Sequence, residues 1–156
     1  LLLNHNKIDI NLKSNVDNDQ LTPLNAAILN DNEEIVQLLI KREDIKINLR
    51  SLQFMRTSGQ ISCEYYIEST PLYQAANRGN SKIFHLLLNH ESIDINAIIH
   101  IKIDRYDTRL EKELVPIYKE ETALFAAINS NKIECVQLLL SRENIDVNFK
   151  VKAERK

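Results

Sequence analysis

The chain of 156 residues contains few of the residues that mark special structures: two glycines, three prolines, two cysteines and no tryptophan. So few glycines exclude a glycine-rich loop that cradles phosphate groups. The two cysteines, Cys63 and Cys135, exclude a scaffold held together by several disulfides. The apolar runs, such as Ile35–Ile40, are far too short to cross a bilayer.

Charge of either sign is not in excess, since 20 basic side chains stand against 22 acidic ones and the net charge is −2. This balance shows neither the basic footprint of a nucleic-acid-binding protein nor a polybasic patch for anionic lipids. An apolar fraction of 44% and a charged fraction of 27% are typical of a globular protein. We therefore expect an intracellular, cytoplasmic protein without nucleic-acid, membrane or small-molecule partners.

Repetition is the most informative feature of the sequence. Three units open with Thr-Pro/Ala-Leu, continue through an aliphatic run, and close with Ile-x-Ile/Val-Asn at the same distance from the opening threonine. The three units run from Thr22 to Asn48, from Thr70 to Asn96 and from Thr122 to Asn148. The segment Leu1–Asn11 resembles the end of such a unit, which suggests that the chain begins inside a repeat and is a fragment of a longer array.

Each unit reads as two short helices. The threonine hydroxyl can cap the first helix, and Pro23 and Pro71 suit the first helical position because no backbone N–H is needed there. The first helix should end near Asp31, Gly79 and Asn131, which tolerate a left-handed backbone. One such pair cannot bury its apolar stripe alone, so the pairs should stack in a line.

These motifs resemble the ankyrin repeat, whose pattern is Thr-Pro-Leu-His-x-Ala-Ala, a glycine turn, Val-Val-x-Leu-Leu-Leu and Asp-x-Asn. The resemblance implies a mainly α fold: an ankyrin-repeat solenoid of helix-turn-helix units with long β-hairpin inserts between repeats. It also implies one domain over residues 1–156. Its expected parts are a partial repeat at 1–21 and repeats at 22–69, 70–121 and 122–156.

The units are spaced more widely than the family period of about 33 residues, since the opening threonines are 48 and 52 residues apart. The extra residues fall in two inserts, Leu49–Ser69 and Ala97–Glu121, whose alternating apolar residues predict hairpins. In the second insert we expect a strand at Ile98–Ile103, a turn at Asp104–Thr108 and a returning strand at Leu114–Tyr118. Pro116 should make the returning strand an edge strand.

Aromatic residues are concentrated in the two inserts, which hold five of the nine. These five are Phe54, Tyr65, Tyr66, Tyr106 and Tyr118. Tyrosine on a projecting hairpin is a common interface residue, because it offers a large apolar area with a polar tip. The alternative is that these rings only pack one hairpin against another.

No group of residues predicts catalysis, a metal site or a bound cofactor. The four histidines, at positions 5, 85, 90 and 100, show no metal-ligand spacing. Cys135 falls in an apolar stripe and Cys63 has no histidine nearby in sequence. The acidic pairs at 33–34 and 120–121 suit a solvated face or a helix N-terminus. We therefore do not expect an enzyme in this chain.

The resemblance implies a non-catalytic protein–protein interaction module that holds a partner on the concave face of its inner helices and hairpins. The residues expected to bind the partner are Leu29, Asn30, Arg56, Tyr66, Asn77, Arg78, Tyr106, Arg109, Asn129 and Ser130. Two alternatives remain: a structural spacer that orients flanking domains, and an active site in flanking segments. Apolar faces at the ends of the array should also permit weak self-association.

Overall fold

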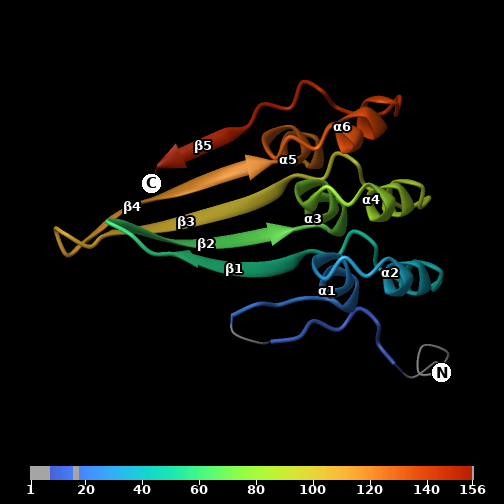
Figure 1. The fold of residues 1–156 in the computed structure, drawn as a ribbon, viewed down its shortest axis with the longest axis horizontal. Coiled ribbons are helices and arrows are strands. Elements are labelled where there is room, and N and C mark those ends of the chain that lie inside the picture. Colours follow the sequence, from blue (N-terminus) through green and yellow to red (C-terminus); the bar gives the residue numbers. More distant parts are fainter. Residues whose placement is uncertain (1–7, 16–17, 156) are drawn as a thin grey trace.

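The helices gather at one end of the molecule and the strands extend from it toward the other end (Figure 1). The structure is a computed structural model and describes residues 8–15 and 18–155. The helices are α1 (Pro23–Leu29), α2 (Glu33–Ile40), α3 (Pro71–Arg78), α4 (Ser81–Leu88), α5 (Ala123–Asn129) and α6 (Ile133–Leu140). The strands are β1 (Ser51–Thr57), β2 (Ile61–Ser69), β3 (Ile99–Asp107), β4 (Lys112–Glu121) and β5 (Lys152–Arg155).

The first helix of each pair begins where the threonine predicts it. The hydroxyl oxygens of Thr22, Thr70 and Thr122 each accept a hydrogen bond from the backbone N–H three residues later, at 3.2, 3.3 and 3.4 Å. Each of these bonds satisfies one of the backbone donors that a helix N-terminus leaves open. The predicted caps of the first helices are therefore confirmed.

The turns between the paired helices use a left-handed backbone, as predicted. The φ angles are 52° at Asp31, 79° at Gly79 and 54° at Asn131. A side chain at Gly79 would also meet the aliphatic part of Lys132 from the next pair, with Cδ 2.3 Å from the added Cβ. The glycine therefore serves both the turn and the contact between neighbouring pairs.

The three helix pairs lie side by side along the stack, with the first helices nearer the sheet (Figure 1). The middle pair contains the largest fully buried side chain of the described residues, Phe84, together with Ile83 and Leu87. Burying aliphatic side chains of this size stabilises the fold by roughly 1.5–3 kcal/mol each. The core is therefore one continuous layer between pairs rather than a centre within any pair.

The strands form a single antiparallel sheet in the order β1-β2-β3-β4-β5. The hairpins predicted in both inserts are present, as β1 with β2 and β3 with β4. In addition, β2 pairs with β3 and β4 pairs with β5, so strands of successive repeats share one hydrogen-bonded sheet. On the far side of β1, Gln20 forms an isolated antiparallel bridge with Leu52.

The prediction of a mainly α solenoid is wrong, because the structure has 32% helix and 28% strand. The inserts are long enough to form strands of seven to ten residues. An exposed edge of that length offers unpaired N–H and C=O groups, which the neighbouring hairpin satisfies. The hairpins therefore join into a sheet rather than remaining separate additions to a helical stack.

Two predictions for the second hairpin are also wrong. The turn lies at 108–111, beyond the predicted position, because β3 continues through Asp104 to Asp107. The returning strand β4 is not an edge strand, since it lies between β3 and β5. Pro116 is tolerated because it lies at a β-bulge, where two residues of β4 face Asp104, and because β5 pairs only from Ile117 onward.

The described part of the predicted partial repeat at 1–21 contacts the first complete unit. Ile10 is buried, and the Asn11 side chain bonds the backbone of Asp44 and Lys46 at 2.8 and 2.7 Å. Residues 1–7 and 16–17 lie outside the described residues, so the structure does not test the predicted repeat end there.

Candidate functional site

Six of the ten residues predicted to bind a partner lie at the C-terminal ends of the first helices. They are Leu29 and Asn30 at α1, Asn77 and Arg78 at α3, and Asn129 and Ser130 at α5. The stacking of α1, α3 and α5 places these ends next to one another. We call these six residues the helix-end row.

The helix-end row is held by contacts between repeats. Ser130 Oγ donates a hydrogen bond to Asn77 Oδ1 at 2.7 Å. The Arg78 guanidinium forms an ion pair with Asp31, whose carboxylate also accepts a bond from Asn80 Nδ2 at 3.3 Å. The hydrogen bond from Arg78 lowers the pKa of Asp31 below its ordinary value. Apart from Leu29, the row is thus a polar surface, in which these contacts already orient Asn77, Arg78 and Ser130.

One face of the sheet meets α3, and we call it the helix-facing face. Gln74 Nε2 of α3 donates hydrogen bonds to Gln53 Oε1 and Ser69 Oγ, both at 3.0 Å. The Tyr73 hydroxyl donates to Glu121 Oε2 at 2.9 Å. Burial, followed by the charge of Glu121, raises the pKa of Tyr73 far above its ordinary value. These buried bonds fix the sheet against the helix stack.

An apolar row crosses the helix-facing face. Met55, Tyr65, Ile103 and Ile117 are paired across four adjacent strands, so their side chains leave the sheet on the same side as Gln53, which is two residues from Met55. We call these four residues the apolar row. Ile103 is buried among its neighbours, whereas Met55 is 48% exposed. Burial also raises the pKa of Tyr65.

The opposite face, which we call the outer face, carries three of the predicted residues: Arg56, Tyr66 and Tyr106. Arg56 pairs with Glu64, Tyr66 with Lys102, and Tyr106 with Ser62. Each is an odd number of residues along its strand from a member of the apolar row, so its side chain leaves the sheet on the other face. The helix-end row and these three residues therefore do not share a surface. The alternation of side chains across a strand separates them.

Two of the outer-face residues are engaged with neighbours. The Tyr66 hydroxyl donates to Glu64 Oε2 at 2.9 Å, and Arg56 forms an ion pair with the same carboxylate. The bond from Tyr66, followed by that from Arg56, lowers the pKa of Glu64. Lys102 Nζ lies 5.3 Å from the centre of the Tyr66 ring. The alternative that hairpin rings pack within the sheet therefore fits Tyr66 well.

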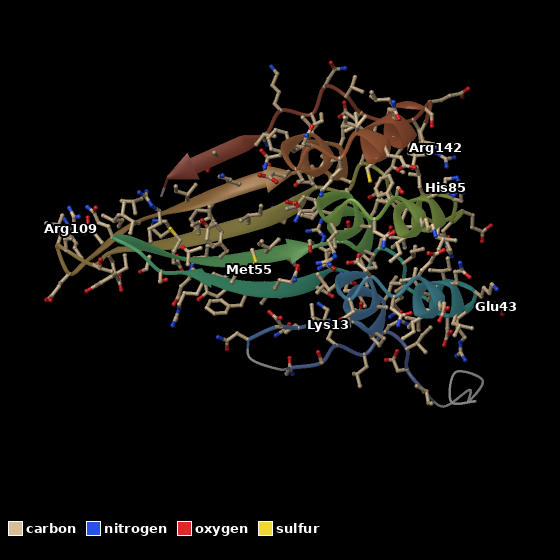
Figure 2. All side chains as sticks on the ribbon, viewed as in Figure 1. Lys13, Glu43, Met55, His85, Arg109 and Arg142 are labelled. Atoms are coloured by element: carbon tan, nitrogen blue, oxygen red, sulfur yellow. The ribbon has the colours of Figure 1, made fainter. Side chains whose placement is uncertain are left out.

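The tenth predicted residue, Arg109, lies in the turn between β3 and β4, at the tip of the sheet farthest from the helices (Figure 2). Its backbone N–H donates to Asp107 Oδ1 at 2.9 Å. The ten predicted residues therefore occupy three separate places: the helix-end row, the outer face and the turn between β3 and β4.

Shallow hollows of about 450 and 600 Å³ lie along the strands, and both are lined mostly by outer-face residues such as Lys102.

Sequence reasoning missed the apolar row as a site. The alternation of Ile99, Ile101 and Ile103 signalled one apolar face of a strand. Nothing in the sequence showed which residues of the other hairpin lie beside them, because that register is set by pairing between repeats.

In the described part of the chain, no group of three or more His, Cys, Asp or Glu residues could hold a metal ion. Cys135 is buried, which raises the pKa of its thiol. His85 and His90 make local contacts, with Asn89 and Ser92, whereas His5 lies outside the described residues. No helix among the described residues has the length and apolarity to cross a membrane.

Stacked helix pairs linked by hairpins define a repeat protein of the solenoid class. A family model described as "Ankyrin repeats (3 copies)" matches residues 53–152, and one described as "Ankyrin repeat" matches residues 19–52. The chain belongs to the ankyrin repeat family. A search of the sequences of curated proteins finds no match to the chain. Ankyrin repeats are generally protein–protein interaction modules, typically bind other proteins, and are generally non-enzymatic.

Proposed function

We propose that the protein is a non-catalytic binding module that holds a partner protein where the helix-end row and the apolar row border the same side of the molecule. The apolar row is the observation that carries this proposal. It places Met55, half exposed, on the face that meets α3. Apolar side chains at a surface bordered by oriented polar groups are a common arrangement at protein interfaces.

The charges around the apolar row favour a particular partner. By strand alternation, Arg105 and Lys119 leave the sheet on the helix-facing face. Glu121, on the same face, is buried and bonded to Tyr73. We therefore expect the bound segment to combine apolar side chains with acidic ones, so that binding weakens as salt is added.

Selection from a displayed library of random peptides tests this proposal. The native chain is the target, and selected peptides are then measured against a Met55→Asp variant and a Tyr106→Ala variant. Met55 is exposed at the edge of the apolar row, so the aspartate should leave the fold intact and repel acidic, apolar peptides. Tyr106 is an exposed residue of the outer face and serves as the matched control.

The expected result is that peptides lose most of their affinity for Met55→Asp and keep it for Tyr106→Ala. Peptides that depend on Tyr106 instead would place the site on the outer face, together with Arg56 and Tyr66. A selection that yields no peptide dependent on either residue would contradict a binding role for the sheet.

A structural spacer is the second candidate, and the continuous sheet favours it. Because β2 pairs with β3 and β4 pairs with β5, bending between repeats would break backbone hydrogen bonds. Peptide selection with the native chain and the Met55→Asp variant distinguishes the two functions. A binding module should yield peptides whose affinity depends on Met55, whereas a spacer should yield none, and X-ray scattering should show the same length and stiffness for both proteins.

A further inference from the structure

A row of aromatic side chains crosses the outer face of the sheet. Its members are Phe54, Tyr66, Lys102 and Tyr118, which are paired across four adjacent strands, and we call them the aromatic row. Their side chains leave the sheet on the side opposite the apolar row. The ring centres of Phe54 and Tyr66 are 5.3 Å apart, and both residues are partly exposed. Tyr118 is 38% exposed, so the rings are held in place and yet reach the surface.

The aromatic row already holds one cation of the chain itself. Lys102 Nζ lies 5.3 Å from the centre of the Tyr66 ring and 2.7 Å from Asp104 Oδ2. This arrangement is favourable because the ring face and the carboxylate both attract positive charge. Farther along the row, Tyr118 of β4 is paired with Glu154 of β5. The outer face therefore presents a second ring with a carboxylate beside it.

A shallow hollow follows the aromatic row. It has a volume of about 450 Å³ and is lined by residues of all five strands, from Leu52 on β1 to Glu154 on β5, with Tyr66 and Tyr118 between them. Adjacent strands lie about 4.8 Å apart, so the hollow extends about 19 Å across the sheet. An extended peptide rises about 3.3 Å per residue, so a segment of about six residues spans this length.

The outer face carries a surplus of negative charge. Its strand positions hold six acidic and three basic side chains besides His100: Glu64, Glu68, Asp104, Glu113, Glu120 and Glu154 against Arg56, Lys102 and Lys152. The basic side chains already form ion pairs with Glu64, Asp104 and Glu120, and Arg50 Nη1, in the loop before β1, lies 3.9 Å from Glu68 Oε2. Glu113 and Glu154 are in excess, so the face attracts positive charge.

We propose that the aromatic row is a second interaction surface, which takes an extended, arginine-rich segment of a partner protein. A guanidinium group is planar, so it can stack on the Tyr118 ring while its N–H groups donate to Glu120 or Glu154, which line the same hollow. The two faces of the sheet then select partners of opposite charge, because Arg105 and Lys119 make the helix-facing face basic. This surface is distinct from the apolar row, and the proposal does not depend on the proposed function.

Single-stranded nucleic acid is the other kind of ligand that stacks on aromatic side chains of a sheet. Such a surface needs basic side chains around the rings, because phosphate groups supply most of the affinity. On the outer face the surplus is acidic, and the ammonium group of Lys102 is already paired with Asp104. The charge therefore favours an arginine-rich peptide over a nucleic acid.

The test measures binding of a fluorescein-labelled Arg-Ser repeat peptide of about six residues to the native chain by fluorescence anisotropy. A Lys-Ser peptide of the same length and charge and a labelled single-stranded oligothymidine are the comparison probes. Tyr118→Ala removes a ring from the aromatic row. Tyr106→Ala is its matched control, because both tyrosines lie on the outer face and are 38% exposed.

Glu154→Gln and Glu113→Gln form a second matched pair. Each variant removes one acidic charge from the outer face, but of the two only Glu154 lines the hollow along the aromatic row. Met55→Asp reports on the helix-facing face, so a failure of the proposed function and a failure of this proposal give different results. Circular dichroism and urea unfolding establish that each variant folds.

We expect the Arg-Ser peptide to bind the native chain more tightly than the Lys-Ser peptide does, because only a guanidinium stacks and donates in one plane. Tyr118→Ala should weaken this binding about two- to fivefold. Glu154→Gln should weaken it more than Glu113→Gln does. Tyr106→Ala and Met55→Asp should not weaken it.

Equal affinity of the native chain and Tyr118→Ala for the Arg-Ser peptide would overturn the proposal. So would oligothymidine binding that depends on Tyr118, because the row would then recognise nucleic acid. A native dimer that Tyr118→Ala abolishes in sedimentation would also overturn it, because the occupant would then be a second copy. If Tyr118→Ala does not fold, the glutamate pair decides, and a loss for Glu154→Gln no larger than for Glu113→Gln refutes the assignment.

Discussion

The middle helix pair, α3 and α4, and the last pair, α5 and α6, have the same sequence pattern and the same helix-turn-helix arrangement, yet they differ in burial. Phe84 and Ala76 of the middle pair are fully buried, whereas their equivalents Val136 and Ile128 are partly or largely exposed. The local helix-turn-helix structure therefore does not depend on having neighbours on both sides. The energy that each side chain contributes does depend on them.

The two pairs should differ most in the stability lost when Phe84, or its equivalent Val136, is shortened to alanine. Phe84→Ala should destabilise the protein by about 3–5 kcal/mol, because it leaves a cavity in the buried core of the helix stack. The equivalent change Val136→Ala should cost clearly less, since Val136 is smaller and only partly buried. Urea unfolding of the two variants measures this. Equal losses would show that the middle pair has no special share of the core.

The bond that joins the middle pair to β4 should be the second largest effect. Tyr73→Phe leaves the buried Glu121 carboxylate without the hydroxyl that donates to it at 2.9 Å, at a cost of about 1–3 kcal/mol. Thermal unfolding measures the loss, and Tyr106→Phe, at an exposed position, should have no effect.

The same bond predicts a dependence on alkaline pH. Burial raises the pKa of Tyr73, so its contribution to stability is present below the pKa of about 10 for an unfolded tyrosine and is lost at higher pH. The Tyr73→Phe variant should therefore lose less stability than the native chain as the pH rises above about 10. Parallel pH profiles of the two proteins would contradict the proposed role of this bond.

A smaller effect concerns the second helices. Asn80 caps α4 by accepting a bond from the N–H of Ile83 at 3.1 Å, whereas Lys132 provides no side-chain cap for α6. Lys132→Asn should stabilise the last pair by about 0.5–1 kcal/mol, partly offset by the loss of the lysine stem that packs near Gly79. Thermal unfolding checks this gain, and Asn80→Lys should have the opposite sign.

The smallest effect should come from the exposed ion pair between Arg78 and Asp31. Arg78→Ala should cost less than about 1 kcal/mol, because both side chains are partly solvated. Arg78 lowers the pKa of Asp31, so this contribution is present above the unfolded pKa of about 3.9 and disappears as the pH falls below it. Native and variant stabilities should converge in acid and at high salt. A constant difference would mean that packing, rather than charge, is lost.

The parts of the structure that could be predicted depend on residues close together in sequence. Thr70 caps α3 by bonding an N–H three residues away, and the turn at Asp31 needs only a residue that tolerates a left-handed backbone. The pattern within one unit carries this information. The residues of the helix-end row were expected because the sequence resembles the ankyrin repeat, and the stacking of α1, α3 and α5 brings these helix ends together.

The sheet could not be predicted to the same extent. Pro116 was expected at an edge, but a β-bulge and the short β5 let it lie within an internal strand. Tyr66 was expected on the same concave face as Arg78, but the register of β1 with β2 turns its side chain to the outer face. A shift of one residue moves a side chain to the other face, and hairpins far apart in sequence set that register.

The sequence by itself determined the helix pairs, their caps and their turns, because each depends on hydrogen bonds and φ preferences within a few residues. Tertiary structure alone decided that two hairpins and a fifth strand form one sheet, which side chains share the face that meets α3, and which equivalent positions are covered. These features follow from pairing and packing between repeats, where residues about 50 positions apart in sequence meet.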